Sequence, residues 1–414
     1  MKVFKFGGAS LKTAAGIRKV GSIVQSFANN PLLLVVSAMG KTTDQLERVQ
    51  AHAHDLQAYK AHLADSKKYH LDIIRELFTN SQEVEDAVME QFGNIQKELF
   101  IDADFDCVYD QVVSKGELIS SLIVYYYLRE IGLPMRWLDA RECILTDNTF
   151  REGKVDWSIT EDRIRAKIAS SKNEILITQG FIGATKDGFT TTLGREGSDF
   201  TAAIFASCLL AESVTIWKDV PGVMNADPKR LPAATVFDEL PFREAAEMTY
   251  YGASVIHPKT IKPLANRQIP LLVKNFDNPE LPGTKIHECV VAQLPPLIVF
   301  KDNQCLVTCK VTDYTFVEEP HLLSIFDALT ELNIRINVMQ NSAITFSFCI
   351  DFRESKVKAL IQKLQRQFEV YYNTGLTLIT IKNYTPEAFE TYRKRPGIML
   401  EQSSRSTLQI LVKN

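Results

Sequence analysis

Two glycine-rich segments place charged side chains where phosphate chemistry needs them. The first, Lys-Phe-Gly-Gly-Ala-Ser (residues 5–10), follows an apolar run and precedes helix-like sequence. Its glycines let the backbone approach a ligand, and N–H groups at a helix N-terminus bind anions. Lys5, at the end of the predicted strand, can reach the same anion. A simple strand–turn–helix corner with an exposed lysine is the alternative interpretation of this segment.

The second segment, Leu-Gly-Arg-Glu-Gly-Ser-Asp-Phe-Thr-Ala-Ala (193–203), is the most informative one. The Arg195 guanidinium can bind a carboxylate through two hydrogen bonds. The N-terminus of the Ala-rich helix that follows adds positive potential for a phosphate. Asp199 has two interpretations at this position: a helix N-cap, which is the commoner role of such an aspartate, or a residue of an active site.

Two further segments follow apolar runs. Ile-Trp-Lys-Asp-Val-Pro-Gly-Val-Met-Asn-Ala-Asp-Pro-Lys (216–229) has the aromatic and charged groups to hold a nucleotide, although a loop without a ligand fits equally well. Val-Val-Ser-Ala-Met-Gly-Lys-Thr-Thr (35–43) imitates a Walker A loop, but Val35 stands where that motif needs glycine, so we exclude a P-loop. Ser37 and Thr43 remain polar groups at the carboxyl end of a strand, where open α/β sheets bind ligands.

The elements that must position these segments alternate between strands and helices. Apolar runs typical of buried strands occur at residues 2–6, 32–37, 174–178, 213–217 and 269–273. This alternation predicts βαβ units and a mainly parallel sheet. Residues 43–100 predict long surface helices. A helix over roughly 114–131 opens with Ser114 and Glu117 at the spacing of a capping box.

A proline-bearing stretch at residues 281–296 predicts a linker, after which the pattern changes. Strands are expected at 307–311, 334–339 and 345–352, and helices at 321–332 and 354–368. This βαββα order suits a ferredoxin-like module. A strand (376–382), a short helix and a hairpin-like tail follow, too few residues for a second complete module. We therefore predict two domains, residues 1–290 and 297–414.

The composition excludes several classes of protein. The 414 residues are 45% hydrophobic and 23% charged, which predicts two or three globular domains. The net charge of −3 gives no reason to expect nucleic acid or a membrane as partner. The seven cysteines form no CxxC pair, which favours reduced thiols. Without an apolar leader or an apolar stretch of eighteen residues, we expect a cytoplasmic location.

Together, these segments resemble the aspartokinases of the amino-acid kinase family. The matching pieces, in the family's order, are KFGGAS at 5–10, VVSAMGKTTDQL at 35–46, SKGELIS at 114–120, ITQGFIG at 177–183, TLGREGSDFTAA at 192–203, IWKDVPGVMNADPK at 216–229 and EAAEMTYYGASVIHPKTIKP at 244–263. The resemblance implies an α/β fold, an αβα sandwich with a mainly parallel sheet, followed by an α+β ACT-like regulatory region that forms a homodimer. It implies transfer of the γ-phosphoryl group of MgATP to the side-chain carboxylate of L-aspartate, at the start of lysine, threonine and methionine biosynthesis.

The resemblance also implies a role for each matching residue. Lys5 would contact the transferring phosphoryl group, and Asp199 would orient Lys5. The aspartate pocket would contain Ser37, Thr43, Glu117 at the α-ammonium and Arg195 at a carboxylate. The expected nucleotide-binding residues are Lys5, Phe6, Gly7, Gly8, Ser10, Trp217, Lys218, Asp219, Met224, Lys229 and Ser254. Mg²⁺ would be held mainly by ATP, so no protein ligand to a metal is expected.

The sequence departs from the family at Glu196, where glycine is usual, and at Ser254, where lysine is frequent. A negative side chain beside a triphosphate is unfavourable unless it points away. Two alternatives stay open: another amino-acid kinase of the same fold, acting for instance on glutamate or N-acetylglutamate, and an inactive amino-acid-sensing protein. Glu117 argues against an N-acylated substrate, because acylation removes the ammonium that it would pair with.

Regulation by lysine is expected to be weak. Lysine-inhibited aspartokinases tend to carry an acidic residue and a Thr-Ser-Glu-like run after the second ACT strand. Asn337 and Ala343 stand at the acidic places here, which deletes charge that a cationic effector needs. The resemblance therefore predicts a tail that serves mainly in dimerisation, with a different effector as the alternative.

Overall fold

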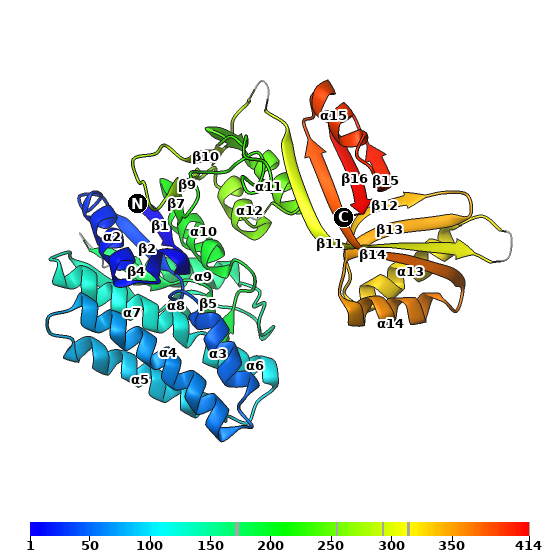
Figure 1. Cartoon of the computed structure of the whole chain (residues 1–414). Coiled ribbons are helices and arrows are strands. Elements are labelled where there is room, and N and C mark those ends of the chain that lie inside the picture. Colours follow the sequence, from blue (N-terminus) through cyan, green and yellow to red (C-terminus); the bar gives the residue numbers. More distant parts are fainter. Residues whose placement is uncertain (170–173, 254–255, 292–293, 313–314, 414) are drawn as a thin grey trace. The chain divides into compact units, whose positions relative to one another are not determined.

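The structure, a computed structural model, describes residues 1–169, 174–253, 256–291, 294–312 and 315–413 (Figure 1). The chain divides into two compact units. The first comprises Met1–Val223, Val236–Ala246 and Val255–Val291. The second comprises Met224–Thr235, Glu247–Ser254 and Ala292–Asn414.

The first unit is built around an eight-stranded sheet. Its strands, in spatial order, are β3 (Met135–Leu138), β4 (Ile175–Gln179), β2 (Leu32–Val36), β1 (Lys2–Phe6), β7 (Ser213–Lys218), β9 (Leu271–Asn275), β10 (Thr284–His287) and β8 (Glu239–Pro241). Neighbouring strands are parallel except for β9 and β10. The predicted mainly parallel sheet is therefore confirmed. A separate antiparallel pair consists of β5 (Ile182–Ala184) and β6 (Thr190–Thr192).

Helices cover both faces of this sheet (Figure 1). The helices of the first unit are α1 (Gly8–Leu11), α2 (Ala14–Gln25), α3 (Thr42–Ala51), α4 (Leu56–Leu77), α5 (Gln82–Glu98), α6 (Phe105–Val113), α7 (Lys115–Glu130), α8 (Ala140–Cys143), α9 (Trp157–Ile168), α10 (Gly197–Leu209) and α12 (Pro258–Asn266). Helix α11 (Phe242–Tyr250) contributes residues to both units. The long helices expected over residues 43–100 are present as α3, α4 and α5. Among the described residues, no helix is both long and apolar enough to cross a membrane.

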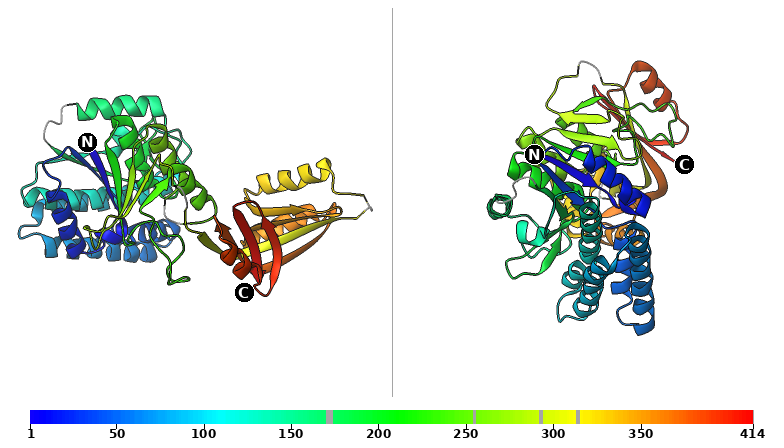
Figure 2. Two further views of the ribbon diagram at one scale, coloured as in Figure 1. Left: turned by 90° about the horizontal axis from the view of Figure 1, so that it is seen from above. Right: turned by 90° about the vertical axis from the view of Figure 1, so that its left-hand side faces the viewer.

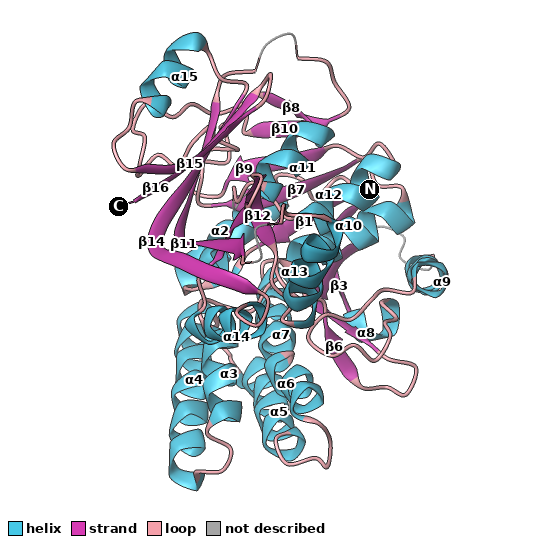
Figure 3. Ribbon diagram, turned by 90° about the vertical axis from the view of Figure 1, so that its right-hand side faces the viewer, coloured by secondary structure: helices cyan, strands magenta, loops and turns pink. Residues whose placement is uncertain are grey.

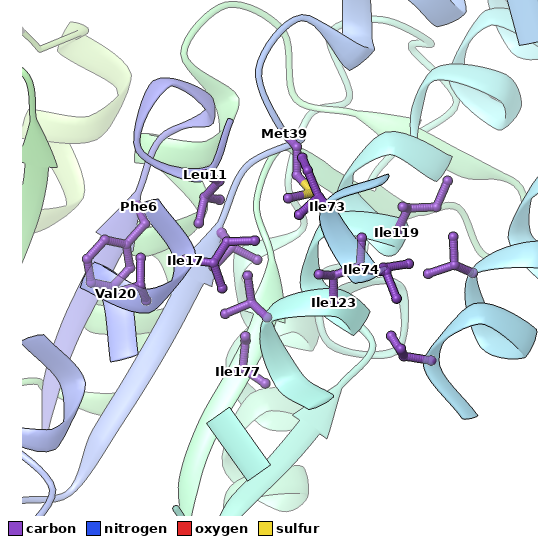
Figure 4. Close-up of a cluster of buried hydrophobic side chains, with 14 of the residues drawn as sticks. Phe6, Leu11, Ile17, Val20, Met39, Ile73, Ile74, Ile119, Ile123 and Ile177 are labelled. Atoms are coloured by element: carbon purple, nitrogen blue, oxygen red, sulfur yellow. The ribbon is translucent and has the colours of Figure 1, made fainter. Parts of the chain in front are cut away.

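The alternation of side chains along β1 decides what each face of the sheet packs against. Phe4 and Phe6 belong to a hydrophobic cluster that also contains buried side chains of α2 to α7. Figure 4 shows part of this cluster, including Phe6 of β1, Ile17 of α2 and Ile73 of α4. Successive side chains of a strand point to opposite faces. Lys5 therefore lies on the other face, where α10 packs against β1 and β7.

The helix expected over residues 114–131 is present as α7, but its predicted capping box is wrong. Ser114 has helical backbone angles (φ −57°, ψ −25°), and its side chain makes no capping hydrogen bond. Its hydroxyl instead donates to the carbonyl oxygen of Gln111 at 2.9 Å. Helix α6 thus leads directly into α7, and Glu117 is free to serve elsewhere.

The second unit contains a six-stranded antiparallel sheet (Figure 3). Its strands, in spatial order, are β12 (Ile336–Asn341), β13 (Thr345–Asp351), β11 (Leu297–Val311), β14 (Phe368–Lys382), β16 (Thr407–Lys413) and β15 (Ile398–Ser403). Three helices accompany it: α13 (Glu319–Glu331), α14 (Glu354–Leu364) and α15 (Pro386–Arg393). Helices α13 and α14 share one hydrophobic cluster with the sheet, and α15 shares another. Figure 2 shows the helices and strands from two further sides. The predicted βαββα order is confirmed and is completed by β14.

Strands β11 and β14 join the two halves of this sheet. Each strand is 15 residues long. The start of β11, from Leu297 to Lys301, pairs with the end of β14, which in turn pairs with β16. The prediction of a strand at 307–311 alone was too short, because the polar residues 301–304 interrupt the apolar run. Register shifts on either side of Gln304 mark the same place in the structure.

Candidate active site

A cavity of about 640 Å³ lies at the carboxyl ends of three adjacent strands of the first unit. Strand β1 runs between β2 and β7, and all three are parallel, so their carboxyl ends meet at one edge of the sheet. Ligands of open α/β sheets bind at such an edge. The predicted site residues that line the cavity are Lys5, Gly8, Ser37, Thr43, Glu117, Arg195, Asp199 and Lys218.

The most strongly charged contact in the cavity joins β1, α10 and β7. Lys5 Nζ lies 2.7 Å from Asp199 Oδ1, and Lys218 Nζ lies 3.5 Å from Asp199 Oδ2. Asp199 is buried. Burial by itself raises the pKa of Asp199, but the ammonium groups of Lys5 and Lys218 outweigh it and hold that pKa below its usual value. Asp199 is therefore an ionised carboxylate between two cations.

Asp199 is not the N-cap of α10, so the capping interpretation is wrong. The N-cap is Glu196, and Asp199 is the third residue of the helix. Glu196 has left-handed backbone angles (φ 53°, ψ 30°) and makes no capping hydrogen bond with its side chain. The first turn of α10 thus presents its N–H groups and the Asp199 carboxylate to the same edge of the sheet.

Glu117 of α7 is a carboxylate enclosed by protein. Its side chain is only 3% exposed, and its Oε2 has no hydrogen-bond partner among the described residues. Burial raises the pKa of Glu117 to about 8, although the charge of Lys5 and a hydrogen bond from the Ala38 backbone act in the opposite direction. A cationic ligand group beside Glu117 would return it to the ionised form.

The remaining predicted substrate residues surround Glu117 and Asp199. Ser37 follows β2 directly, and its N–H donates to the carbonyl oxygen of Phe6 at 3.1 Å. Ser37 and Thr43 are half-buried, whereas Arg195 is exposed. Within the described part of the chain, the Arg195 guanidinium has no hydrogen-bond or ion-pair partner. Its donors are therefore available to a ligand.

Gly8 allows the segments after β1 and β2 to touch. A Cβ atom at Gly8 would lie 2.6 Å from the carbonyl oxygen of Ala38, and the N–H of Gly40 donates to the carbonyl oxygen of Gly8 at 3.0 Å. The helix that begins at Gly8 has only four residues. Its dipole is correspondingly small. The helix dipole therefore contributes less to anion binding than the individual backbone N–H groups and Lys5.

Several predicted nucleotide-binding residues do not line this cavity. Phe6 and Trp217 stack on each other in the core, with ring centroids 6.1 Å apart, and Trp217 is 2% exposed. Both rings lie in the core rather than in the cavity, and the role of these two residues at the nucleotide stays a prediction. Ser10 and Asp219 line a separate cavity of about 340 Å³.

The remaining expected nucleotide residues are Gly7, Met224, Lys229 and Ser254. Gly7 precedes α1 and its N–H group remains a candidate ligand to phosphate. Met224 and Lys229 belong to the second unit. Ser254 lies outside the described residues. Their roles stay predictions.

Asp110 holds Arg151 and Thr192, two cavity residues that none of the motifs indicated. The buried Asp110 carboxylate accepts hydrogen bonds from the N–H of Arg151 (2.9 Å) and from the N–H and hydroxyl of Thr192 (2.9 and 2.8 Å). The Arg151 guanidinium lies 4.1 Å from the ring centroid of Tyr109. Arg151, Thr192 and Tyr109 all line the cavity. One signal was available, because Arg-Glu-Gly occurs both at 151–153 and at 195–197.

Comparison with known proteins identifies relatives along the whole chain. Residues 1–275 match the model of the amino acid kinase family. The chain is 30% identical to the lysine-sensitive aspartokinase 3 of Escherichia coli strain K12 over 400 residues, which cover 92% of this chain and 86% of that protein. It is also 30% identical to the bifunctional aspartokinase/homoserine dehydrogenase 2 of Zea mays, covering 88% of this chain and 41% of that protein. The chain spans about two fifths of the length of such bifunctional plant relatives.

Solved structures of aspartokinases also match this chain. E. coli aspartokinase III in complex with aspartate and ADP, in its R-state, matches with a TM-score of 0.85 and 28% identity, covering 100% of this chain and 96% of that chain. The structure of the same enzyme with lysine and aspartate, in its T-state, matches with a TM-score of 0.83. The matches extend over both units of the chain.

Proposed function

Because this chain belongs to the amino acid kinase family, and to the aspartokinases within it, we propose that it transfers the γ-phosphoryl group of ATP to the side-chain carboxylate of L-aspartate. The product is 4-phospho-L-aspartate. The observation that carries the proposal is one cavity that contains the Lys5–Asp199–Lys218 cluster, the buried Glu117 and Arg195, which has no partner among the described residues. A relative of 28% identity has been solved with aspartate and ADP, which supports both substrates.

The charges of the cavity complement free aspartate. Aspartate carries two carboxylates and one ammonium, and Arg195 can bind a carboxylate through two hydrogen bonds. Glu117 supplies the single negative group that the α-ammonium needs. The hydroxyls of Ser37 and Thr43 add polar contacts that can orient the reacting carboxylate.

The reaction requires positioning and charge neutralisation rather than a protein nucleophile. The aspartate side chain is already ionised at neutral pH, so no general base is needed. Phosphoryl transfer is accelerated by in-line alignment and by cations beside the phosphoryl oxygens. We assign Lys5 to the transferring group and Lys218 to the neighbouring phosphates. Asp199 holds both ammonium groups and is a positioning residue.

Mg²⁺ would supply further charge neutralisation on the phosphates of ATP. The cavity fits such a cation, because Oε2 of Glu196 is a buried carboxylate oxygen without a hydrogen-bond partner among the described residues. Gly7 and Gly8 follow β1 directly, and their backbone N–H groups are proposed to bind the phosphates. Asp219, Met224, Lys229 and Ser254 stay predicted contacts of the nucleotide.

The second unit is proposed to be an ACT-like region that forms a homodimer. Its βαββαβ order and antiparallel sheet are the support for this assignment. A cytoplasmic location remains our prediction.

The proposed activity is tested by coupling ADP release to a spectroscopic readout with L-aspartate, L-glutamate and N-acetylglutamate in parallel. Release of ADP with L-aspartate alone is the expected result. Preferred turnover of either of the other acceptors would assign a different amino-acid kinase. ADP release with none of the three, despite ATP binding, would support a sensing protein.

A further inference from the structure

We propose that Glu196 is a ligand, direct or through water, of the divalent cation bound to the nucleotide. The inference rests on the proposed function, because it needs a nucleotide phosphate in the cavity. It departs from the expectation that Mg²⁺ is held mainly by ATP without a protein ligand. Three independent features of Glu196 lead to it.

The first feature is the backbone of Glu196. Its φ of 53° and ψ of 30° lie in the left-handed region. Glycine adopts these angles without a steric penalty, whereas a side chain makes them unfavourable. The side chain does not offset this penalty locally, since it makes no capping hydrogen bond to α10. An unfavourable conformation that is kept at an active site points to a function of the side chain.

The second feature is the carboxylate itself. Oε2 of Glu196 is buried and has no hydrogen-bond partner, and Glu196 forms no ion pair within the described ranges. A buried carboxylate oxygen without a partner is strongly unfavourable. The neighbouring ammonium groups of Lys5 and Lys218 are already held by Asp199. Oε2 of Glu196 therefore needs a cation, and the described residues do not supply one.

The third feature is the place of Glu196 in the cavity. Glu196 lines the same cavity as Lys5 and Lys218, to which we assign the phosphates. A carboxylate and a phosphate repel each other unless a cation lies between them. Mg²⁺ suits this place, because it is bound through one or two carboxylates together with substrate phosphates and waters.

The α-ammonium of aspartate is the competing partner. Aspartate brings only one ammonium. The buried Glu117 already offers it a carboxylate oxygen, Oε2, which has no hydrogen-bond partner among the described residues. Two carboxylates for one ammonium would leave one of them uncompensated. With the ammonium at Glu117 and the metal at Glu196, both carboxylates are compensated.

The experiment measures binding of ADP to the full chain by calorimetry, once with excess Mg²⁺ and once with EDTA. The quantity compared is the factor by which Mg²⁺ tightens ADP binding. Glu196→Gln is expected to lower this factor by about tenfold, the effect typical of losing an outer ligand of a metal. ADP affinity in EDTA should stay equal or improve, since a charge that repels phosphate is gone. Glu152→Gln, a carboxylate of the same cavity, is the matched control and should behave like wild type.

Glu196→Gly provides a second test that does not depend on the fold tolerating glutamine. It removes the carboxylate and suits the left-handed backbone. The factor by which Mg²⁺ tightens ADP binding must fall as much in this variant as in Glu196→Gln. An unchanged Mg²⁺ factor in both variants would overturn the proposal. So would a loss confined to aspartate binding, which would assign Glu196 to the ammonium. Wild-type protein that binds no ADP at all would overturn the proposed function together with this inference, whereas aspartate-dependent turnover with an unchanged factor overturns the inference alone.

Discussion

Asp199 and Lys5 illustrate how a buried ion pair serves position more than stability. Removing two charges from water costs much of what their attraction returns, so such a pair adds little to the free energy of unfolding. Its value lies in geometry. Asp199 fixes the Lys5 ammonium at 2.7 Å, and an ammonium has three N–H donors. The donors that Asp199 does not use can reach a phosphoryl group.

Replacing Lys5 tests this role. We expect Lys5→Ala to lower kcat by at least about a hundredfold, as for the loss of one preorganised electrostatic group. KM for aspartate should change much less, because aspartate is assigned to Arg195 and Glu117. Steady-state kinetics together with thermal unfolding separates this effect from misfolding. A folded variant that retains wild-type kcat would remove Lys5 from the mechanism.

Glu117 predicts a pH dependence of substrate binding. Because burial raises the pKa of Glu117 to about 8, the unliganded protein holds it mainly protonated at pH 7. Only the ionised form pairs with the α-ammonium, so KM for aspartate should fall as the pH rises from about 6.5 to 8.5, with the midpoint set by that pKa. Glu117→Gln should raise KM and abolish this pH dependence. A wild-type KM that is constant over the range would contradict the assignment.

The same pKa has a consequence for stability. A carboxyl whose pKa is raised on folding binds more protons in the folded state between its ordinary pKa of 4.5 and about 8. The folded protein therefore loses stability over that window as the pH rises. In unliganded Glu117→Gln this loss should be absent, and its melting temperature should fall less between pH 6 and pH 8 than that of wild type. An equal fall in both proteins would show that Glu117 does not cause it.

Motifs identified the charged residues of the site but not which of their neighbours face it. Lys218 and Trp217 are adjacent in β7, and adjacent side chains of a strand point to opposite faces. Since Lys218 faces Asp199, Trp217 has to enter the core on the other side. The same rule separates Lys5 from Phe6. The alternation of side chains along a strand is therefore enough to place both aromatic side chains in the core rather than in the cavity.

At the scale of elements, the sequence predicted what is periodic and missed what depends on partners. The long helices and the parallel strands follow from hydrophobic patterns. The capping box at Ser114 failed because α6 already supplies the residues that precede α7, so no free N-terminus exists there. The full length of β11 was hidden because its middle is polar. Pairing with β14 on one side and β13 on the other keeps these residues in a strand.

An internal polar network occupies the position expected to recognise lysine. The Asn337 amide donates to Gln304 Oε1 (2.6 Å) and to Asp351 Oδ1 (2.9 Å), and its carbonyl oxygen accepts from Lys301 Nζ (2.8 Å). Lys301 Nζ also lies 2.8 Å from Asp351 Oδ1. The acidic group of this network is thus already paired with an ammonium of the chain itself. A free lysine would have to displace it.

We therefore expect lysine to inhibit the enzyme weakly or not at all. The aspartokinase assay titrated with lysine should show no inhibition at submillimolar concentrations, with threonine titrated in parallel as a comparison. Lys301→Met removes the ammonium that is paired with Asp351 and should increase sensitivity to lysine. Submillimolar inhibition of the wild-type protein would show that the interpretation of Asn337 and Ala343 is wrong.

At the scale of the whole molecule, the second unit leaves apolar side chains uncovered. Leu323 is 63% exposed, Met339 is 48% exposed and Ile344 is 42% exposed. Met339 lies in β12, and Ile344 directly precedes β13. Strand β12 is the last strand at one end of its sheet. Exposed apolar groups next to an edge strand promote association unless something covers them. In a two-fold symmetric dimer, the same region of a second copy of this chain would cover the exposed apolar side chains of each copy.

The predicted homodimer can be tested by light scattering after size exclusion, which should give twice the chain mass of 46.7 kDa. Leu323→Glu combined with Met339→Glu places charges in the proposed interface and should shift the protein toward monomer. Both side chains are exposed in the single chain, so the substitutions should leave its fold intact. Leu56→Glu, at a 60% exposed leucine at the start of α4 in the first unit, is the matched control and should stay dimeric. A dimer that survives the double substitution would place the interface elsewhere, and a monomeric wild type would exclude it.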